Sequence, residues 1–348
     1  MRTHTILWTM VSWILLHALV QGKDWVVYEG DKGPGKGKHI VFIASDHEYR
    51  GEESCPAIAR IMARHYGFKC TVLFGLDDAG HIKAGSSRIP GMDALDSADM
   101  MFLFMRFLAP DDASMKHFES YLDRGGPVLG LRTTTHAFNG LKGTYEKYNH
   151  RYGDESYKLG FGRQVLGETW AGHYGRNHQF STRLDIIPGQ AKHPVLTGVK
   201  DMHTKAGAYS AKPMPNSVIL ANNQVLKTMD QGAEAQEGKP PMPAVWVRTY
   251  PSKSGKAGRV FCSTQGASED IVNEGFRRCI INGVFWCMGM EKDIKADMDV
   301  SFVGPYNPAT FSFGGERKGV KPADIEGWDT PIWSKDAPTK GQKKKKKK

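Results

Sequence analysis

The sequence predicts an α/β protein, with a doubly wound, mostly parallel sheet and helices on both faces. Two observations predict this class. Short apolar runs, such as HIVFIAS at residues 39–45, have the near-continuous apolar character of parallel strands that are buried on both sides. Segments with helical spacing of apolar residues alternate with these runs, which is the order that covers a parallel sheet with helices.

The first half of the chain holds four of the expected strands and two helices. One helix runs from about Ser54 to Tyr66, because apolar residues recur there at helical spacing. A second opens at Pro110, has acids in its first turn, and ends near Arg124 before a double glycine. The strands are expected at residues 39–45, 68–74, 100–105 and 127–131.

The second half begins with an irregular insertion over residues 140–175, rich in Gly, Tyr and Arg, which we expect near the carboxyl edge of the sheet. A closing helix over residues 273–288 places Phe276, Ile280 and Phe285 on one apolar side. One domain over residues 38–290 is therefore the economical interpretation. Further strands are expected at residues 184–187, 217–222, 244–250 and 259–263.

Both ends of the chain differ in composition from this domain. Residues 1–22 have a basic start, an apolar stretch and a small-residue cleavage site, which is typical of a secretory signal peptide. An uncleaved anchor is the alternative, but the apolar stretch is shorter than a membrane span. We expect an exported protein, periplasmic or extracellular, with no membrane span after cleavage. Residues 23–37 form an N-terminal extension, and residues 291–338 a C-terminal one that straps across the domain.

The formal net charge of +10 comes almost entirely from the chain ends. Arg2 and seven lysines of the tail at residues 339–348 account for eight charges, which leaves +2 for the rest. Such a tail is typically solvated and disordered, and the alternative is a tether to an anionic surface. The nearly neutral body predicts no nucleic-acid partner.

The five cysteines are expected to be buried free thiols, because the count is odd and two of them lie in apolar strand-like runs. None has the C-x-x-C spacing of a cysteine-based zinc site.

A polar cluster follows the first strand, where open α/β sheets place their ligand crevice. Asp46, His47 and Glu48 bring a histidine beside two acids, which can act as general acid or base or bind a metal. The alternative is that they cap the following helix and pair with one another. We expect His47 and Glu48 to be catalytic candidates.

Two arginines follow later strands. Arg106 and Arg132 could each bind hydroxyl, keto or carboxylate oxygens of a ligand, or form structural ion pairs with nearby acids. Thr133, Thr134 and His136 come directly after the fourth strand, and early helix positions such as His136 often become buried. All five are candidates for substrate binding.

The insertion and the last strand complete the candidate set. Trp170, His173, Tyr174 and His178 combine aromatic rings with polar groups, as sugar sites do, although a loop that packs on itself explains Trp170 equally well. Gln265 and Glu269 follow the last strand; Glu269 could be a second carboxylate or a helix cap. Of these, His173 and Glu269 are the catalytic candidates.

The chain resembles the trehalose-utilisation (ThuA-like) family, whose fold is similar to the flavodoxin-like fold of class I glutamine amidotransferases. The resemblance covers roughly residues 38–290. It implies an α/β fold and a role in the metabolism of oxidised sugars, notably 3-keto disaccharides. The motifs that carry it are HEYRGEES (47–54), PVLGLRTTTHAF (127–138), GETWAGHYGRNH (167–178), HPVLTGV (193–199), PAVWVRTY (243–250), GRVFCSTQGASED (258–270) and FWCMG (285–289).

Two departures limit what the resemblance implies. Glutamine amidotransferases of this fold carry a catalytic Cys at the strand-to-helix elbow, whereas this chain offers Thr133 or Thr134, which argues against glutaminase chemistry. Many family members have a Gly-His pair after the last strand, where this chain has Gly266 and Ala267.

Three functions follow from the sequence. The leading hypothesis is an exported enzyme that acts on a small carbohydrate, an oxidised (3-keto) sugar or glycoside, by general acid/base chemistry; Arg106 and Arg132 would then hold oxyanion charge. The second is a carbohydrate-binding protein without turnover. The third is a metal-dependent hydrolase with ligands from Asp46, His47, Glu48 and His173. We expect no cofactor and leave a divalent metal open.

Overall fold

The computed structural model describes residues 24–332, so the predicted signal peptide and lysine tail lie outside the described residues. The strands are β1 (Trp25–Glu29), β2 (His39–Ser45), β3 (Lys69–Phe74), β4 (Met100–Met105), β5 (Val128–Leu131), β6 (Thr182–Ile186), β7 (His203–Thr204), β8 (Val218–Val225), β9 (Met242–Tyr250) and β10 (Gly258–Ser263). The α-helices are α1 (Gly51–Tyr66), α2 (Asp112–Asp123) and α3 (Glu274–Cys287).

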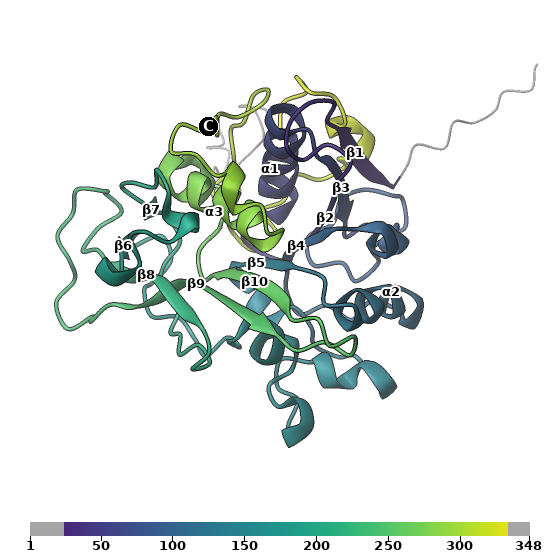
Figure 1. The fold of residues 1–348 in the computed structure, drawn as a ribbon, viewed down its shortest axis with the longest axis horizontal. Helices are drawn as coiled ribbons and strands as arrows, with labels where there is room; N and C mark the ends of the chain where they lie inside the picture. The colour runs from purple at the N-terminus through teal and green to yellow at the C-terminus, as the bar shows by residue number, and fades with distance from the viewer. Residues whose placement is uncertain (1–23, 333–348) are drawn as a thin grey trace, which may run out of the picture.

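All ten strands join in one sheet, in the order β1-β3-β2-β4-β5-β10-β9-β8-β6-β7 (Figure 1). The central run from β3 to β10 is parallel, and α1 and α2 form its crossovers between β2 and β3 and between β4 and β5. Every residue of β2 and of β4 is buried, as their apolar runs predicted. The α/β class is confirmed.

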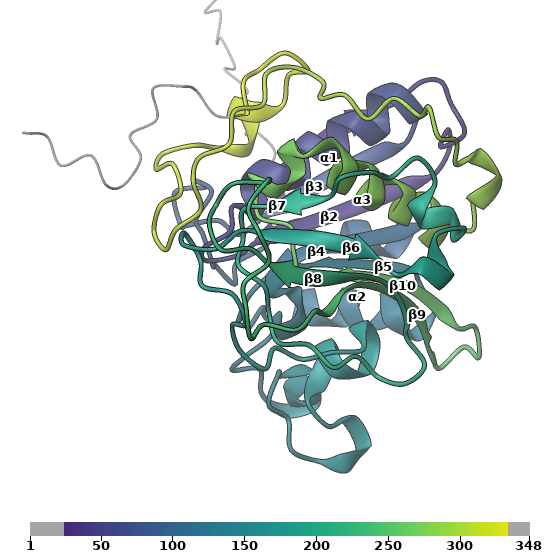
Figure 2. The same ribbon diagram turned by 90° about the vertical axis from the view of Figure 1, so that its left-hand side faces the viewer.

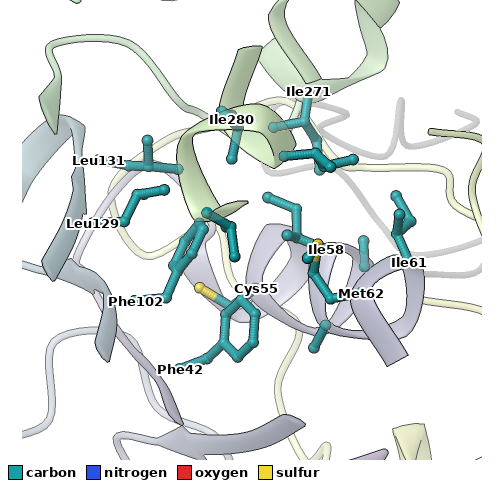
Figure 3. Close-up of a cluster of buried hydrophobic side chains, with 14 of the residues drawn as sticks. Phe42, Cys55, Ile58, Ile61, Met62, Phe102, Leu129, Leu131, Ile271 and Ile280 are labelled. Atoms are coloured by element: carbon teal, nitrogen blue, oxygen red, sulfur yellow. The ribbon is translucent and has the colours of Figure 1, made fainter. Parts of the chain in front are cut away.

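Helices cover both faces of this parallel half. Phe42 and Phe102 point to the face where α1 and α3 pack, while Ile43 and Leu103 point to the opposite face, toward α2. Figure 3 shows Phe42 and Phe102 between the strands and the α1 residue Ile58. The sheet therefore has one apolar core on each side.

The prediction of a mostly parallel sheet is wrong. Of the nine pairs of neighbouring strands, four are parallel and five antiparallel. Strands β9, β8, β6 and β7 extend the sheet from β10 with alternating direction, because no helix connects β8 to β9 or β9 to β10. The sheet is mixed.

The two extensions of the domain contribute to the fold. Residues 23–37 contain β1, an antiparallel edge strand that sequence reasoning missed. In the C-terminal extension, the Ile325 carbonyl accepts hydrogen bonds from Tyr28 Oη (2.6 Å) and Arg60 Nη2 (2.9 Å). Figure 2 shows this yellow extension and the blue-green insertion on opposite sides of the sheet. The extension therefore lies across α1 and the edge strand.

The insertion at residues 140–175 contains only short 3-10 and π turns, as expected. Its end is fixed against the antiparallel half, where Trp246 Nε1 donates to the Leu166 carbonyl (2.7 Å).

All five cysteines are buried and free, which confirms that prediction. Between residues 24 and 332, no helix has the length and apolar character needed to cross a membrane.

Candidate functional site

The carboxyl ends of β2, β4, β5 and β10 meet at one edge of the sheet, because these strands are parallel neighbours in register. Polar segments leave the sheet there, and a loop of the insertion and part of the C-terminal extension lie against them. The four segments are residues 46–50, 106–107, 132–136 and 264–270.

Asp46 shapes the first of these segments rather than facing a ligand. It is buried, and its carboxylate accepts the backbone N–H groups of Glu48 (2.7 Å) and Tyr49 (2.9 Å). These bonds fix the turn before α1, and Asp46 Oδ2 also accepts the N–H of Gly51, the first residue of α1 (3.4 Å). Asp46 therefore matches the alternative interpretation, in which these side chains stabilise the start of the helix. Its bond to the Glu48 N–H also fixes the backbone of Glu48.

Glu48 is the carboxylate that this turn presents at the edge. Its Oε2 lies 3.6 Å from Arg106 Nη1, and its Oε1 accepts a hydrogen bond from Asn177 Nδ2 (3.3 Å). Burial raises the pKa of Glu48, although the charges of Arg106 and Arg132 oppose the shift. A carboxyl with a raised pKa is suited to both taking and giving a proton.

His47 lies beside Glu48 with its ring packed against Gly85. An added Cβ on Gly85 would lie 2.4 Å from the imidazole, and Gly85 has a φ of +70°, so a glycine is needed there. Burial and the positive charge of Arg106 lower the pKa of His47, so the ring is neutral at neutral pH. Its Nδ1 is buried without a hydrogen-bond partner.

Arg106 borders the same space and is mostly buried. Its guanidinium lies 5.1 Å from the centre of the Phe107 ring and 4.7 Å from that of Phe313, a residue of the C-terminal extension. The Arg106 Nε is buried without a hydrogen-bond partner. Two aromatic rings thus orient the guanidinium while one of its donors stays unused.

Arg132 differs, because both of its Nη groups donate to protein acceptors, although its Nε, like that of Arg106, is buried without a hydrogen-bond partner. The side chain is fully buried between the rings of Tyr49 (4.3 Å) and Tyr209 (3.8 Å). Its Nη1 donates to the carbonyls of Gly207 (2.7 Å) and Thr264 (2.9 Å). Three further acceptors are Gln265 Oε1 (3.3 Å), Tyr49 Oη (3.1 Å) and Asn177 Oδ1 (3.3 Å).

The strand-to-helix turn after β5 holds Arg132 where the amidotransferase comparison placed a threonine. Arg132 has a φ of +47°, the strained conformation that an elbow residue adopts, and the threonines follow it in a short 3-10 helix. The Thr134 hydroxyl donates to the Leu131 carbonyl (2.7 Å), while the Thr133 hydroxyl is buried without a hydrogen-bond partner. The elbow carries a buried arginine.

A wall of aromatic rings adjoins these groups. His136 is buried between Phe107 (4.8 Å between ring centres) and Trp170 (5.2 Å). Trp170 lies 6.0 Å from His173, which packs edge-on against Tyr209 (5.2 Å). The Trp170 Nε1 is buried without a hydrogen-bond partner, so one donor of the wall is unused.

Both histidines of this wall are neutral at neutral pH. Burial, with the charges of Arg106 and other neighbours, lowers the pKa of His136 well below its usual value. His173 lies on an exposed loop, yet one side of its ring is covered; this desolvation and the charges of Arg132 and Arg106 lower its pKa to about 4. His173 is therefore a hydrogen-bonding group rather than a strong base.

The other candidates serve contacts within the protein. Tyr174 Oη donates to the Pro240 carbonyl (2.9 Å), and the His178 ring stacks on Phe311 (4.4 Å). Gln265 is fully buried and donates to Asn223 Oδ1 (3.0 Å). Glu269 Oε2 accepts the backbone N–H of Phe311 (3.3 Å), and burial raises the pKa of Glu269. Glu269 thus holds the C-terminal extension.

The candidates therefore divide into two groups. The structure brings Glu48, His47, Arg106, His136, Trp170 and His173 to one edge. The others lie inside or make contacts within the protein: Arg132, Thr133, Thr134, Tyr174, His178, Gln265 and Glu269. Sequence reasoning missed Phe107, Asn177, Tyr209 and Phe313. Phe107 directly follows Arg106, and Asn177 lies inside a motif already singled out, but no pattern pointed to Tyr209 or Phe313.

The hollow that fits this edge is not the largest one. A cavity of about 410 Å³ is lined by residues 173–177, the loop that carries His173 and Asn177. A larger one, about 610 Å³, lies between residues 87–93 and 109–117. We place the site at the smaller hollow, because unused buried donors and the Glu48–Arg106 pair border its loop. Among residues 24–332, no group of three or more His, Cys, Asp or Glu side chains is arranged to hold a metal ion.

Comparisons with known proteins find similar solved structures, two of which are described here. No family model matches the chain, and no curated protein matches it. A ThuA-like protein from Parabacteroides merdae is 14% identical, with 80% of this chain and 98% of that one aligned at a TM-score of 0.48. One from Bacteroides uniformis is 13% identical, with 77% and 98% aligned at a TM-score of 0.46. Both belong to the family that the sequence motifs resemble, and at these identities they carry no argument about the site.

Proposed function

We propose that this protein acts on a small carbohydrate, an oxidised (3-keto) sugar or glycoside, by general acid/base chemistry at the carboxyl edge of the parallel strands. One observation carries the proposal. Glu48, a buried carboxylate with a raised pKa, forms an ion pair with Arg106, which has a buried Nε without a hydrogen-bond partner, and both lie beside a wall of aromatic rings. Sugars need this combination, since ring faces cover their C–H patches and polar groups satisfy their hydroxyls.

Glu48 is the proton-transfer residue in this scheme. Its carboxylate takes the proton from the carbon next to the keto group, and Arg106 stabilises the negative charge that develops on the keto oxygen. In a 3-keto glycoside the enolate then re-forms the carbonyl, a double bond forms between C1 and C2, and the C1–O bond to the leaving sugar breaks. The leaving oxygen takes a proton from the newly protonated Glu48, which restores the carboxylate.

His47, His136, Trp170 and His173 complete the site as neutral groups. The lowered pKa values of the three histidines keep positive charge off the wall, so hydrogen bonds to hydroxyls are the contacts they offer. Arg132 acts through the turn it stabilises, because its Nη groups donate to protein acceptors. The predicted signal peptide adds export to the periplasm or outside the cell as part of the proposal, with the lysine tail available to an anionic surface.

The test is turnover of 3-keto-trehalose by the purified protein, with separate additions of zinc, manganese and calcium. We expect product from the wild type, and a kcat lower by about 10²- to 10⁴-fold in Glu48→Gln, with binding retained. Glu146→Gln is the matched control, because Glu146 is an exposed residue of the insertion that is not among the candidates. Turnover that is unchanged in Glu48→Gln would contradict the mechanism, and activity only with added metal would favour the metal-dependent hydrolase.

A second candidate function is carbohydrate binding without turnover. It is favoured by the elbow after β5, where a buried arginine stands in place of a nucleophile. Thermal stabilisation by 3-keto-trehalose or trehalose, without any product, would support it. Loss of that stabilisation in Trp170→Ala, but not in Glu48→Gln, would locate binding at the aromatic wall.

A further inference from the structure

A segment of the C-terminal extension, residues 305–316, lies over the candidate site; we refer to it as the strap. Two carboxylates of the domain hold its backbone: Glu53 Oε2 accepts the N–H of Ala309 (3.0 Å), and Glu269 Oε2 accepts the N–H of Phe311 (3.3 Å). Tyr306 Oη also donates to the Ser268 carbonyl (2.8 Å). The strap is therefore fixed to the elements that form the edge.

Phe311 fastens the middle of the strap. Its ring is fully buried, 5.0 Å from the ring of Tyr49 and stacked at 4.4 Å on His178. Tyr49 and His178 belong to the two segments that carry Glu48 and His173. Phe311 thus joins both sides of the site and sets the position of the residues that follow it.

Phe313, two residues further, is not used by the core. It is 58% exposed, the highest value among the three exposed large apolar side chains between residues 24 and 332. The ring contacts the guanidinium of Arg106, whose carbon lies 4.7 Å from the ring centre. Contact with a cation on one side leaves the rest of an aromatic ring open beside Glu48 and Arg106, which an apolar patch of a ligand would cover.

We propose that Phe313 contacts the ligand, as an aromatic platform that the C-terminal extension adds to the site. The C–H face of a sugar ring packs on Phe313, and its oxygens face Arg106 and Glu48. Because Arg106 lies between Phe107 and Phe313, the same ring also holds the guanidinium in the orientation that binding needs. This inference rests on the proposed function and adds a specificity-determining residue to it.

The test compares Phe313→Ala with wild type in binding and turnover of 3-keto-trehalose. We expect Kd and KM to rise by about tenfold, as loss of one aromatic platform predicts. The melting temperature should stay within about 2 °C of wild type, because truncation of an exposed side chain costs little stability. Phe313→Trp should restore binding, while the control Val272→Ala, another exposed apolar residue, should leave it unchanged.

The outcomes separate this inference from the function on which it rests. Unchanged Kd and KM in Phe313→Ala, together with lost turnover in Glu48→Gln, would overturn the role of Phe313 and leave the proposed function standing. A wild type that neither binds nor converts 3-keto-trehalose would overturn the proposed function itself. A fall in melting temperature that Phe313→Trp does not reverse would show that Phe313 is structural.

Discussion

The turns after β4 and β5 have similar backbones, but their arginines make different contacts. Each holds an arginine, and each contains a residue in the left-handed conformation, Phe107 (φ 49°) in one and Arg132 (φ 47°) in the other. The Arg132 guanidinium donates to five protein acceptors. The Arg106 guanidinium has a long contact with Glu48 and two aromatic faces.

This difference shows how to distinguish an arginine that holds protein segments together from one that can bind a ligand. A buried guanidinium with its donors engaged holds segments together, because each acceptor would otherwise be left without a partner. Stacking and a buried, unpaired Nε are common to both arginines, so the Nη groups make the difference. A guanidinium such as that of Arg106, whose Nη1 makes only a 3.6 Å contact with Glu48, can still form bonds to something outside the protein. Residue type and position in sequence do not separate the two cases.

The most severe test of the comparison is Arg132→Met. Loss of the guanidinium leaves the carbonyls of Gly207 and Thr264 buried without donors, so we expect the free energy of unfolding to fall by about 3 kcal/mol or more. Urea denaturation measures this loss. An unfolding midpoint equal to that of wild type would show that Arg132 does not hold the site together.

Arg106→Met should give the converse result. Stability should fall less than in Arg132→Met, because one 3.6 Å ion pair and stacking contacts are lost, and Glu48, whose pKa burial already raises, can bind a proton when its partner is removed. The kcat/KM for 3-keto-trehalose should fall by about 10²-fold, the usual effect of removing one group that stabilises developing negative charge. Arg106→Lys keeps the charge without the planar guanidinium, and full activity in that variant would show that stacking is unimportant.

A smaller effect, on the pH dependence of stability, extends the comparison to a fully buried carboxyl group, that of Glu53. Burial and the neighbouring charge of Glu52 raise the pKa of Glu53 well above its usual value, and the Arg50 guanidinium, 3.7 Å from Glu53 Oε1, offsets this only in part. The folded state therefore binds this proton more tightly than the unfolded state. Its stabilising contribution is present below the unfolded pKa and is lost as pH rises through the raised folded pKa.

Glu53→Gln tests this sign. The glutamine stays neutral and can still accept the Ala309 N–H, so we expect the variant to be more stable than wild type at pH 8. The difference should shrink as the pH falls toward 4, because wild type then gains its proton. Denaturation midpoints of the two proteins across this range measure it, and a gap that grows as the pH falls would show that the charged form is favoured.

The sequence predicted the parallel half of the fold well and the antiparallel half poorly. An apolar run such as HIVFIAS indicates a strand buried on both faces, and an intervening helix sets its direction. Residues 244–250 and 259–263 were recognised as strands, but strand patterns do not specify direction. The edge strand β1 was missed because it is a five-residue run outside the recognised motifs, and its pairing with β3 joins residues about 45 positions apart.

For the candidate site, the sequence predicted which residues gather at the edge of the sheet, and not what each of them contacts. Polar residues after parallel strands must gather at one edge, which was enough to name Glu48, Arg106 and His136. The use of Arg132 depends on carbonyls that lie 75 and 132 residues away along the chain, and the sequence pattern contains no trace of them. Contacts between distant segments decide which polar groups remain free.

The bond between Glu53 and Ala309 joins residues that are 256 positions apart. During synthesis Glu53 leaves the ribosome early and Ala309 late, so the sheet and α1 can form before the strap has been synthesised. Until residue 309 has emerged, Glu53 and Glu269 lack their strap partners, and Arg106 lacks the ring of Phe313. The candidate site is thus completed only after most of the domain has been synthesised, and contacts over such sequence distances form slowly.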